Sequence, residues 1–298
     1  MKSKGAWSIM RYEGRIFRPP SEAYSLIVQS SVGCSHNRCA FCSMYKEKTF
    51  HLRPLGQVLE DLELARAQYA HVEKIFIADG DALVRAFSDW EQILAKIAAL
   101  FPECRSVTSY ASSKSVATKT DAQLRALGAQ GLAMVYVGLE SGCDAVLARM
   151  DKGENARGII DACLRLKAAG IRLSVTAISG LGGRALMREH AEETARALSE
   201  IRPDYIGLLT LMVEEGTPLM QWCREGRFEV LSAREVMEEE LMLLERIDAE
   251  GAVFRANHAS NYLPLRGTLN RDRAALTALL RDALGDRVAL RPEAWRGL

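Results

Sequence analysis

The chain has 298 residues, of which 48% are hydrophobic and 26% charged, and its net charge at pH 7 is +1. This composition is typical of a globular protein with a large core and excludes collagen-like and disordered chains. The near-neutral charge excludes the strongly basic surface of a dedicated nucleic-acid-binding protein, and no apolar run reaches the roughly 18 residues of a membrane span.

Seven short apolar runs recur along the chain, and we predict that each is a β-strand. Most carry Val, Ile or Leu at both alternating positions, as expected for strands that are covered on both faces. The runs are 25–31, 74–80, 106–112, 134–140, 172–179, 205–212 and 252–257.

Amphipathic segments between these runs predict helices, because their apolar residues recur at helical spacing. The clearest stripes are Ile93, Leu94, Ile97 and Leu100, then Ile159, Ile160, Cys163 and Leu164, then Met237, Leu241 and Leu244. A further helix is predicted to begin at Asp121, as its N-cap, and to end at Gly128.

The alternation of strands and helices predicts an α/β fold with a parallel sheet built from right-handed βα units. About six to seven such units without a linker favour a partial TIM-type barrel over a doubly wound sheet. We expect an N-terminal extension over residues 1–23, a barrel core over 24–215, and C-terminal helices and a cap that close the barrel over 216–298.

Polar and glycine-rich stretches follow the predicted strands at their carboxyl ends, where barrels of this kind place their chemistry. They read DGD after the second strand, ESG after the fourth, SGLGG after the fifth and EEGTP after the sixth. A loop with three cysteines, Cys34, Cys39 and Cys42, follows the first strand. We therefore expect these loops to share one rim of the barrel.

The three clustered cysteines indicate metal binding or catalysis rather than disulfides. The N-terminus lacks the apolar segment of a secretory signal, so we expect a cytoplasmic protein, whose thiols stay reduced. A structural zinc site is one interpretation, with His36 as the fourth ligand, but the other four cysteines are scattered singly. A thioredoxin-like Cys39-x-x-Cys42 pair leaves the third cysteine unexplained. A [4Fe–4S] cluster on three thiolates leaves one iron open for a substrate or cofactor.

A strand, a loop with three close cysteines whose last is preceded by an aromatic residue (Cys39-Ala-Phe-Cys42), and then a βα barrel together resemble the radical S-adenosylmethionine (SAM) superfamily. The resemblance spans roughly residues 24–215. It implies a [4Fe–4S] cluster on Cys34, Cys39 and Cys42, whose open iron chelates the amino and carboxylate groups of SAM. The spacing Cys-x4-Cys-x2-Cys departs from the commonest Cys-x3-Cys-x2-Cys of that superfamily. It resembles a variant subgroup related to coproporphyrinogen oxidase, elongator and methylthiotransferase-like radical SAM domains.

The resemblance also implies a set of SAM-binding residues. Phe41 and Ile178 match residues that pack against adenine, and Gly180 matches a glycine that permits a close approach of the backbone. ADGD at 78–81 stands where a Gly-Gly-Glu-like turn holds the SAM amino group, and Glu140 matches the residue that binds the ribose hydroxyls. The remaining predicted SAM-binding residues come from these same turns or from strand ends, and they are Asp79, Gly80, Asp81, Ser112 and Ser141.

Substrate residues are predicted from the FRANHASNYLPLRG stretch at 254–267, which follows the seventh strand. His258 titrates near neutral pH and suits proton transfer, and Tyr262 lies nearby. Arg255 or Arg266 could bind a substrate carboxylate. Cys143 could donate hydrogen to a radical, although a small buried hydrophobic role is the commoner use of such a cysteine. A cap that only satisfies buried backbone groups is the alternative for the whole stretch.

The resemblance implies an enzyme that reductively cleaves SAM to a 5′-deoxyadenosyl radical, which abstracts hydrogen from a small substrate. An anionic substrate is one option. Reduced flavodoxin or ferredoxin is the electron donor that it implies, and we expect neither a membrane nor a nucleic-acid partner. Two alternatives stay open. One is a non-catalytic iron–sulfur protein for electron transfer or redox sensing, and the other is an RNA-modifying radical SAM enzyme.

Overall fold

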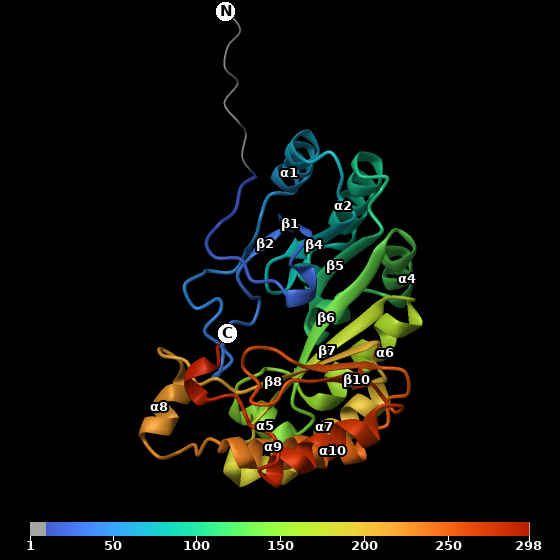
Figure 1. Ribbon diagram of the computed structural model, residues 1–298. Coiled ribbons are helices and arrows are strands. Elements are labelled where there is room, and N and C mark those ends of the chain that lie inside the picture. The colour runs from blue at the N-terminus through green and yellow to red at the C-terminus, as the bar shows by residue number, and fades with distance from the viewer. Residues whose placement is uncertain (1–9, 298) are drawn as a thin grey trace, which may run out of the picture.

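The computed structural model describes residues 10–297, and its central feature is a curved, open β-sheet of eight strands (Figure 1). The spatial order is β1-β4-β5-β6-β7-β8-β9-β10, with β1 and β10 at the two edges. Neighbours from β1 to β9 pair in parallel, and β10 pairs antiparallel with β9. The strands are β1 Leu26–Gln29, β4 Lys74–Ala78, β5 Ser106–Ala111, β6 Leu132–Glu140, β7 Arg172–Ser179, β8 Tyr205–Thr210, β9 Val253–Ala256 and β10 Leu265–Thr268. The predicted partial TIM-type barrel is confirmed, and its sheet does not close.

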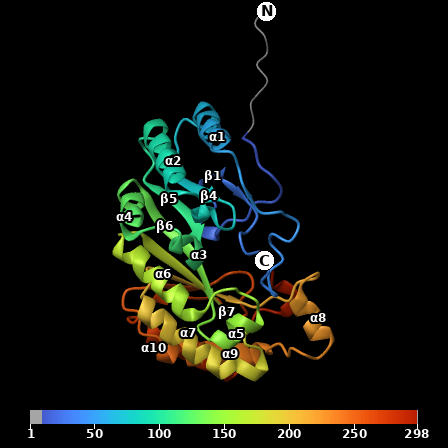
Figure 2. The same ribbon diagram turned by 180° about the vertical axis from the view of Figure 1, so that it is seen from behind.

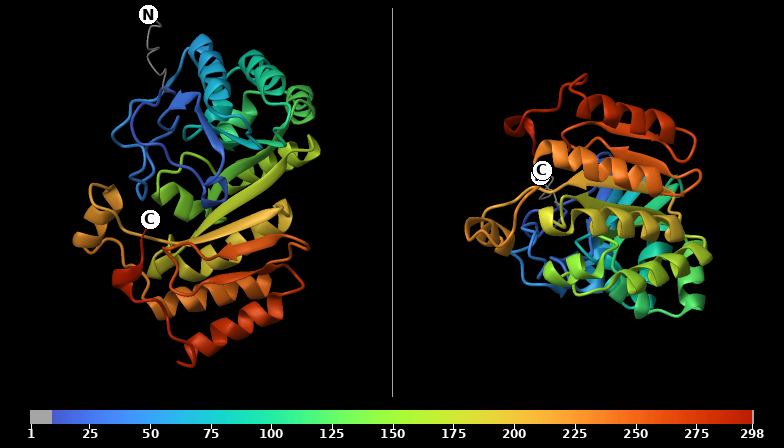
Figure 3. Two further views of the ribbon diagram at one scale, coloured as in Figure 1. Left: turned by 45° about the horizontal axis from the view of Figure 1, so that its top comes forward. Right: turned by 90° about the horizontal axis from the view of Figure 1, so that it is seen from below.

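Helices connect successive parallel strands and cover the outer face of the sheet, as the view from behind shows (Figure 2). In the view from below, α6, α7, α9 and α10 lie against the outside of the sheet, where α7 packs on α9 and α9 on α10 (Figure 3). The helices are α1 Leu55–Gln68, α2 Phe87–Leu100, α3 Ser113–Ala117, α4 Asp121–Ala129, α5 Asp144–Arg149, α6 Ala156–Ala168, α7 Met187–Ile201, α8 Pro218–Arg224, α9 Ala233–Arg246 and α10 Arg273–Leu284.

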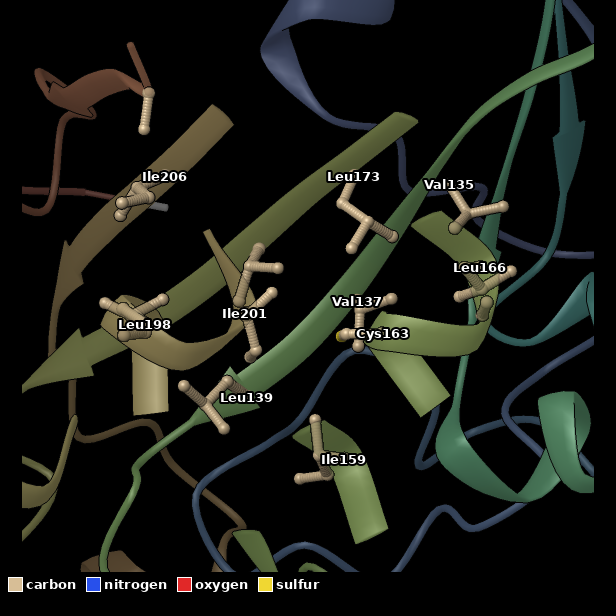
Figure 4. Packing of buried hydrophobic residues seen from close by; sticks show 14 of the residues in the cluster. Val135, Val137, Leu139, Ile159, Cys163, Leu166, Leu173, Leu198, Ile201 and Ile206 are labelled. Carbon is tan, nitrogen blue, oxygen red and sulfur yellow. The ribbon is translucent and has the colours of Figure 1, made fainter. Parts of the chain in front are cut away.

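The main core lies between the sheet and these helices. Val135, Val137 and Leu139 alternate along β6 and point outward, where Ile159 and Cys163 of α6 meet them (Figure 4). All of these side chains are buried. Burying an aliphatic side chain of this size contributes about 1.5–3 kcal/mol, so this layer stabilises the sheet and fixes which residues of β6 face inward.

The inner face of the sheet is filled on one side only. Phe76 of β4, Tyr110 of β5 and Tyr136 of β6 pack edge to face, with ring centroids 5.2 Å apart between Phe76 and Tyr110 and 5.9 Å apart between the two tyrosines. Several residues of β7 and β8 that line the cavity are small instead, namely Ser174, Thr176 and Gly207, whereas Ile178 and Leu209 stand nearer the carboxyl ends of these strands. This asymmetry leaves an open cavity inside the barrel.

Four local features differ from the sequence predictions or were missing from them. The N-cap of α4 is Thr120 rather than Asp121, because the Thr120 hydroxyl accepts the Gln123 N–H in a reciprocal capping box. That helix ends at Ala129, one residue after Gly128. Strand β10 was not predicted, and neither was the two-residue ladder between β2 (Ser31–Val32) and β3 (His51–Leu52).

The sheet continues beyond residue 215 through β9 and β10, and the C-terminal segment returns to it. Arg296 stacks on the Tyr262 ring at 4.0 Å and donates a hydrogen bond of 2.8 Å to the Leu211 carbonyl oxygen, just after β8. Across residues 10–297, none of the helices has the length and apolar character needed to span a lipid bilayer.

Candidate functional site

The candidate site is a cavity of about 2060 Å³ on the inner face of the sheet. Its walls come from the loops at the carboxyl ends of the strands, from the inward residues of β5 to β9, and from part of the segment before β1. Cys34, Cys39 and Cys42 all line this cavity, and none of them is in a disulfide. Gly80 and Asp81, Glu140, and Glu214, from three other stretches that were predicted to share the rim, also line the cavity, whereas no residue of the SGLGG stretch at 179–183 does.

The cysteine loop is closed at its base by the β2–β3 ladder and anchored to the barrel at several points. The Gly33 N–H donates to Asp79 Oδ2 at 3.1 Å, and the Gly33 carbonyl oxygen accepts the Gly80 N–H at 3.1 Å. On the opposite side, the Ala40 N–H donates to the Met150 carbonyl oxygen at 2.8 Å. The Ser43 hydroxyl donates to Glu214, in the EEGTP loop after β8. These bonds hold the three thiols toward the cavity from both sides.

The Cys39 and Cys42 thiols are partly buried. Burial raises the pKa of the Cys39 thiol to about 12, and the nearby Lys152 ammonium opposes this shift only in part. Burial also raises the pKa of Cys42. Such thiols stay protonated until a metal replaces their protons, which is how metal binding couples to deprotonation of its ligands.

The donor chemistry of this loop fits an iron–sulfur cluster, which thiolates hold. His36, the fourth ligand that a zinc site would use, has its Nε2 atom 2.6 Å from the Asp151 carbonyl oxygen. Within the described part of the chain, no group of three or more His, Cys, Asp and Glu side chains is gathered about one point to hold a single metal ion, as a zinc site requires. The thiolates of a cluster bind different irons and do not need such a common point.

The turn after β4 supports the cysteine loop and also reaches the cavity. Asp79 is fully buried, and its Oδ2 atom pairs with Lys48 Nζ at 2.6 Å. A Cβ atom at Gly80 would lie 2.7 Å from Tyr45 Cε2 and 3.1 Å from Cys34 Cβ, so only glycine lets the turn pack against the loop. Asp79 is thus engaged in holding the loop, while Gly80 and Asp81 line the cavity.

Asp81 is held by two hydroxyls. Its Oδ2 atom accepts from Ser35 Oγ at 2.6 Å and from Ser112 Oγ at 2.7 Å, and its buried Oδ1 atom has no hydrogen-bond partner among the described residues. Burial raises the pKa of the Asp81 carboxyl, and the two serine hydroxyls partly counteract the shift. An unpartnered buried carboxylate oxygen at a cavity wall is a polar atom that a ligand donor would satisfy.

Glu140 ends β6 at a bulge and points into the cavity. Its φ is +62°, and it forms an ion pair of 3.3 Å with Lys152. Gly138 makes room for this side chain, because a Cβ atom there would lie 2.0 Å from Glu140 Oε1. Burial lowers the pKa of Lys152 and the Glu140 charge raises it, and the net shift is upward. Lys152 stays positively charged and was not predicted from the sequence.

Phe41 and Ile178 join the same hydrophobic cluster on the cavity wall, although 137 positions separate them in sequence. Behind Ile178 lies a buried polar network. His190 Nε2 is 3.0 Å from the Ile178 carbonyl oxygen, and its Nδ1 atom is 2.7 Å from Ser141 Oγ. The Gly180 N–H donates to Glu239 Oε1 at 2.6 Å. Ser141 and Gly180 therefore connect the loops after β6 and β7 to helices α7 and α9.

Of the three predicted substrate residues, His258 lines the cavity, whereas Tyr262 and Cys143 are buried outside its wall. His258 lines the cavity, its Nδ1 atom lies 3.0 Å from Ser260 Oγ, and burial together with the Arg291 charge lowers its pKa. Tyr262 is buried away from the cavity wall, and its hydroxyl donates to Glu293 at 2.5 Å. Cys143 is buried at the start of α5 in the hydrophobic cluster that contains Ile178.

Residues of the predicted N-terminal extension also form part of the wall. Phe17, Arg18 and Ser21 line the cavity, and Ser21 Oγ lies 2.8 Å from the Tyr136 hydroxyl. The sequence carries no motif in this segment that would have revealed the contact.

A comparison of the sequence with models of protein families agrees with this geometry. Residues 28–198, more than half of the chain, match the family model described as the Radical SAM superfamily. The chain belongs to the radical SAM superfamily. It is an enzyme of this class, whose cofactors are a [4Fe–4S] cluster and SAM. None of the curated proteins compared matches the sequence.

Several solved radical SAM proteins share the fold at low sequence identity. Methylornithine synthase has a TM-score of 0.52 and 15% identity, over 86% of this chain and 68% of its own. The radical SAM methyltransferase TsrM from Kitasatospora setae has a TM-score of 0.55 and 18% identity, over 70% of this chain and 42% of its own. Elp3 from Methanocaldococcus infernus has a TM-score of 0.50 and 14% identity, over 89% of this chain and 63% of its own. This chain thus spans less than two thirds of the latter two.

Proposed function

We propose that Cys34, Cys39 and Cys42 hold the [4Fe–4S] cluster and that SAM occupies the adjoining part of the cavity. The observation that carries this proposal is the convergence of three free thiols, the Gly80–Asp81 turn and Glu140 on one cavity. Three protein thiolates leave one iron of a four-iron cluster without a protein ligand, which is the position that a substrate or cofactor takes.

Each residue has a task that follows from its chemistry. Glu140 accepts hydrogen bonds from the ribose hydroxyls, and Lys152 holds its carboxylate in place at 3.3 Å. The free Oδ1 atom of Asp81 accepts from the SAM amino group. Phe41 and Ile178 offer an apolar contact for adenine. Asp79, Ser141 and Gly180 position these side chains, because their polar atoms are engaged in the loops behind the cavity wall.

A reduced cluster held by Cys34, Cys39 and Cys42 would supply the electron for cleavage of SAM to methionine and a 5′-deoxyadenosyl radical, and this radical would take a hydrogen atom from a small substrate. The chain's contribution is to keep that substrate beside the SAM site and away from solvent, which the inner surfaces of β5 to β9 provide. We further propose a cytoplasmic enzyme that receives its electron from reduced flavodoxin or ferredoxin. His258, which lines the same cavity, is the proposed proton-transfer group for the substrate.

Anaerobic reconstitution tests this assignment. We expect about four irons per chain in the wild type, together with formation of 5′-deoxyadenosine when SAM and dithionite are added. Cys39→Ala should lose both signals. Cys104→Ala is the matched control, since Cys104 is also a free, partly buried cysteine but lies between α2 and β5. Equal iron content and turnover in the two variants, or a lone zinc ion in the wild type, would overturn the assignment.

A further inference from the structure

Charged side chains of both signs line the cavity, and some of the cations have no acidic partner. Acidic side chains such as Asp81, Glu140 and Glu214 belong to the loops at the carboxyl ends of the strands. Lysines of these loops also line the cavity, among them Lys114 and Lys152. Four further cations stand at the amino ends of strands or within one, namely Lys74, Arg105, Arg172 and Arg255, and the buried Glu22 lies just before β1. Within residues 10–297, none of these four cations has a carboxylate oxygen within 4.0 Å. Low-dielectric walls concentrate the field of such uncompensated charges on whatever occupies the cavity.

Arg255 of β9 has an unusual neighbour. It stands directly opposite Arg266 of the antiparallel strand β10, so the two side chains project from the same face of the sheet. Like charges at directly opposite positions destabilise a sheet unless an anion lies between them. Arg255 Nη1 donates to two neutral acceptors, the carbonyl oxygens of Phe254 at 2.9 Å and Gly267 at 3.5 Å. Among the described residues, its Nη2 and Nε atoms have no acceptor.

Space for a ligand adjoins Arg255. Gly207 of β8 is paired with Thr176 of β7 on one side and with Arg255 on the other. A Cβ atom at Gly207 would meet only Thr176 Oγ1 within 4 Å, at 3.7 Å, and the backbone there does not require glycine. Glycine inside a strand costs stability and often marks a close approach by a ligand. Its missing side chain leaves open cavity floor between a hydroxyl and a guanidinium.

From these juxtapositions we propose that the substrate carries an anionic group, a carboxylate or a phosphate, which binds over Gly207 to Arg255 and Arg266. The guanidinium of Arg255 presents free N–H donors that match two oxygens of such a group. Thr176 donates a hydroxyl from the other side, and Arg172 adds positive charge farther along β7. This inference rests on the proposed function in that it names the substrate class of the same cavity.

The test measures anion binding separately from SAM chemistry. Thermal unfolding of the reconstituted protein is followed against inorganic phosphate and against succinate, with chloride as the reference at constant ionic strength. We expect a midpoint that rises with phosphate, succinate or both, and the ion with the lower apparent Kd identifies the group. Arg255→Gln should weaken this binding by about tenfold or more, as expected for hydrogen bonds to a charged group.

Three further variants make the result specific. Arg266→Gln should weaken anion binding and raise the midpoint measured in chloride, because it removes the repulsion with Arg255. Gly207→Val keeps both arginines and should block binding by filling the open floor. Arg125→Gln, on the exposed surface of α4, should bind as the wild type does. The proposal is overturned if no anion raises the midpoint, if Arg255→Gln binds as tightly as the wild type, or if Arg125→Gln loses binding equally.

The same preparations are assayed for 5′-deoxyadenosine without any substrate. This assay distinguishes a failure of the proposed SAM chemistry from a failure of the proposed anion site. Loss of SAM cleavage with Arg255-dependent anion binding would remove the proposed function and leave the anion site. SAM cleavage without Arg255-dependent binding would remove the anion site alone.

Discussion

Gly80→Ala tests whether the turn after β4 sets the position of the first cluster cysteine. The added methyl group would lie 2.7 Å from Tyr45 Cε2 and 3.1 Å from Cys34 Cβ. Tyr45 has little freedom to move away, because it is buried, packs edge to face on Phe17 at 5.3 Å and has Lys48 Nζ 5.6 Å from its ring centroid. Overpacking of this kind typically costs about 1–3 kcal/mol. We therefore expect a loss of that size in the free energy of unfolding.

The cysteine loop should give way before the sheet does, so iron incorporation should fall as well. Urea unfolding of the protein without iron measures the first effect, and iron content after anaerobic reconstitution measures the second. Gly56→Ala is the matched control. A Cβ atom there meets nothing within 4 Å, and alanine in a helix is favoured over glycine by up to about 1 kcal/mol. If Gly80→Ala unfolds and incorporates iron as Gly56→Ala does, the proposed role of this turn is wrong.

Three other predictions follow from the structure. Lys152→Met leaves the Glu140 carboxylate without its partner, so the free energy of unfolding should fall by about 3 kcal/mol and SAM should bind more weakly in calorimetric titration. The control is Lys96→Met, which breaks the exposed pair with Glu63 and should lower the free energy of unfolding by less than about 1 kcal/mol. Burial raises the pKa of Glu240 from 4.5 to about 8, so the folded state binds this proton more tightly and stability falls as the pH rises from 4.5 toward 8. In urea unfolding at pH 7, Glu240→Met should therefore be more stable than the wild type by up to about 3 kcal/mol, and at pH 4 it should gain little. An equal gain at both pH values would contradict this assignment. Anaerobic removal of iron with a chelator should lower the thermal midpoint of the wild type and leave that of Cys39→Ala unchanged, because a ligand that binds only the folded state stabilises it.

The parallel strands were predictable because their signal is local. All seven apolar runs overlap strands, since a strand covered on both faces needs apolar residues at successive positions. Strand β10 escaped prediction because Leu265–Thr268 contains Arg266, Gly267 and Thr268 and is an edge strand with a single neighbour. The cap of α4 was misplaced by one residue because Thr120 and Asp121 are both good N-caps, and the capping box with Gln123 decides between them.

The candidate site was predictable where chemistry sits in short motifs. The cysteine loop, the Gly80–Asp81 turn and Glu140 could each be picked from their neighbours in sequence, and the fold brings them to one cavity. Lys152 could not be found in this way, because its pairing with Glu140 depends on the path of the chain through α5. The support given by His190 and Glu239 depends in the same way on how α7 and α9 pack on the sheet.

The measurement that tests the central claim most directly is electron paramagnetic resonance of the reduced, reconstituted protein before and after addition of SAM. If one iron has no protein ligand and SAM binds beside Glu140, the spectrum of the wild type should change on addition of SAM. Glu140→Gln should retain the cluster signal and need more SAM for the same change. A spectrum that SAM leaves unaltered in fully loaded wild-type protein would contradict the account.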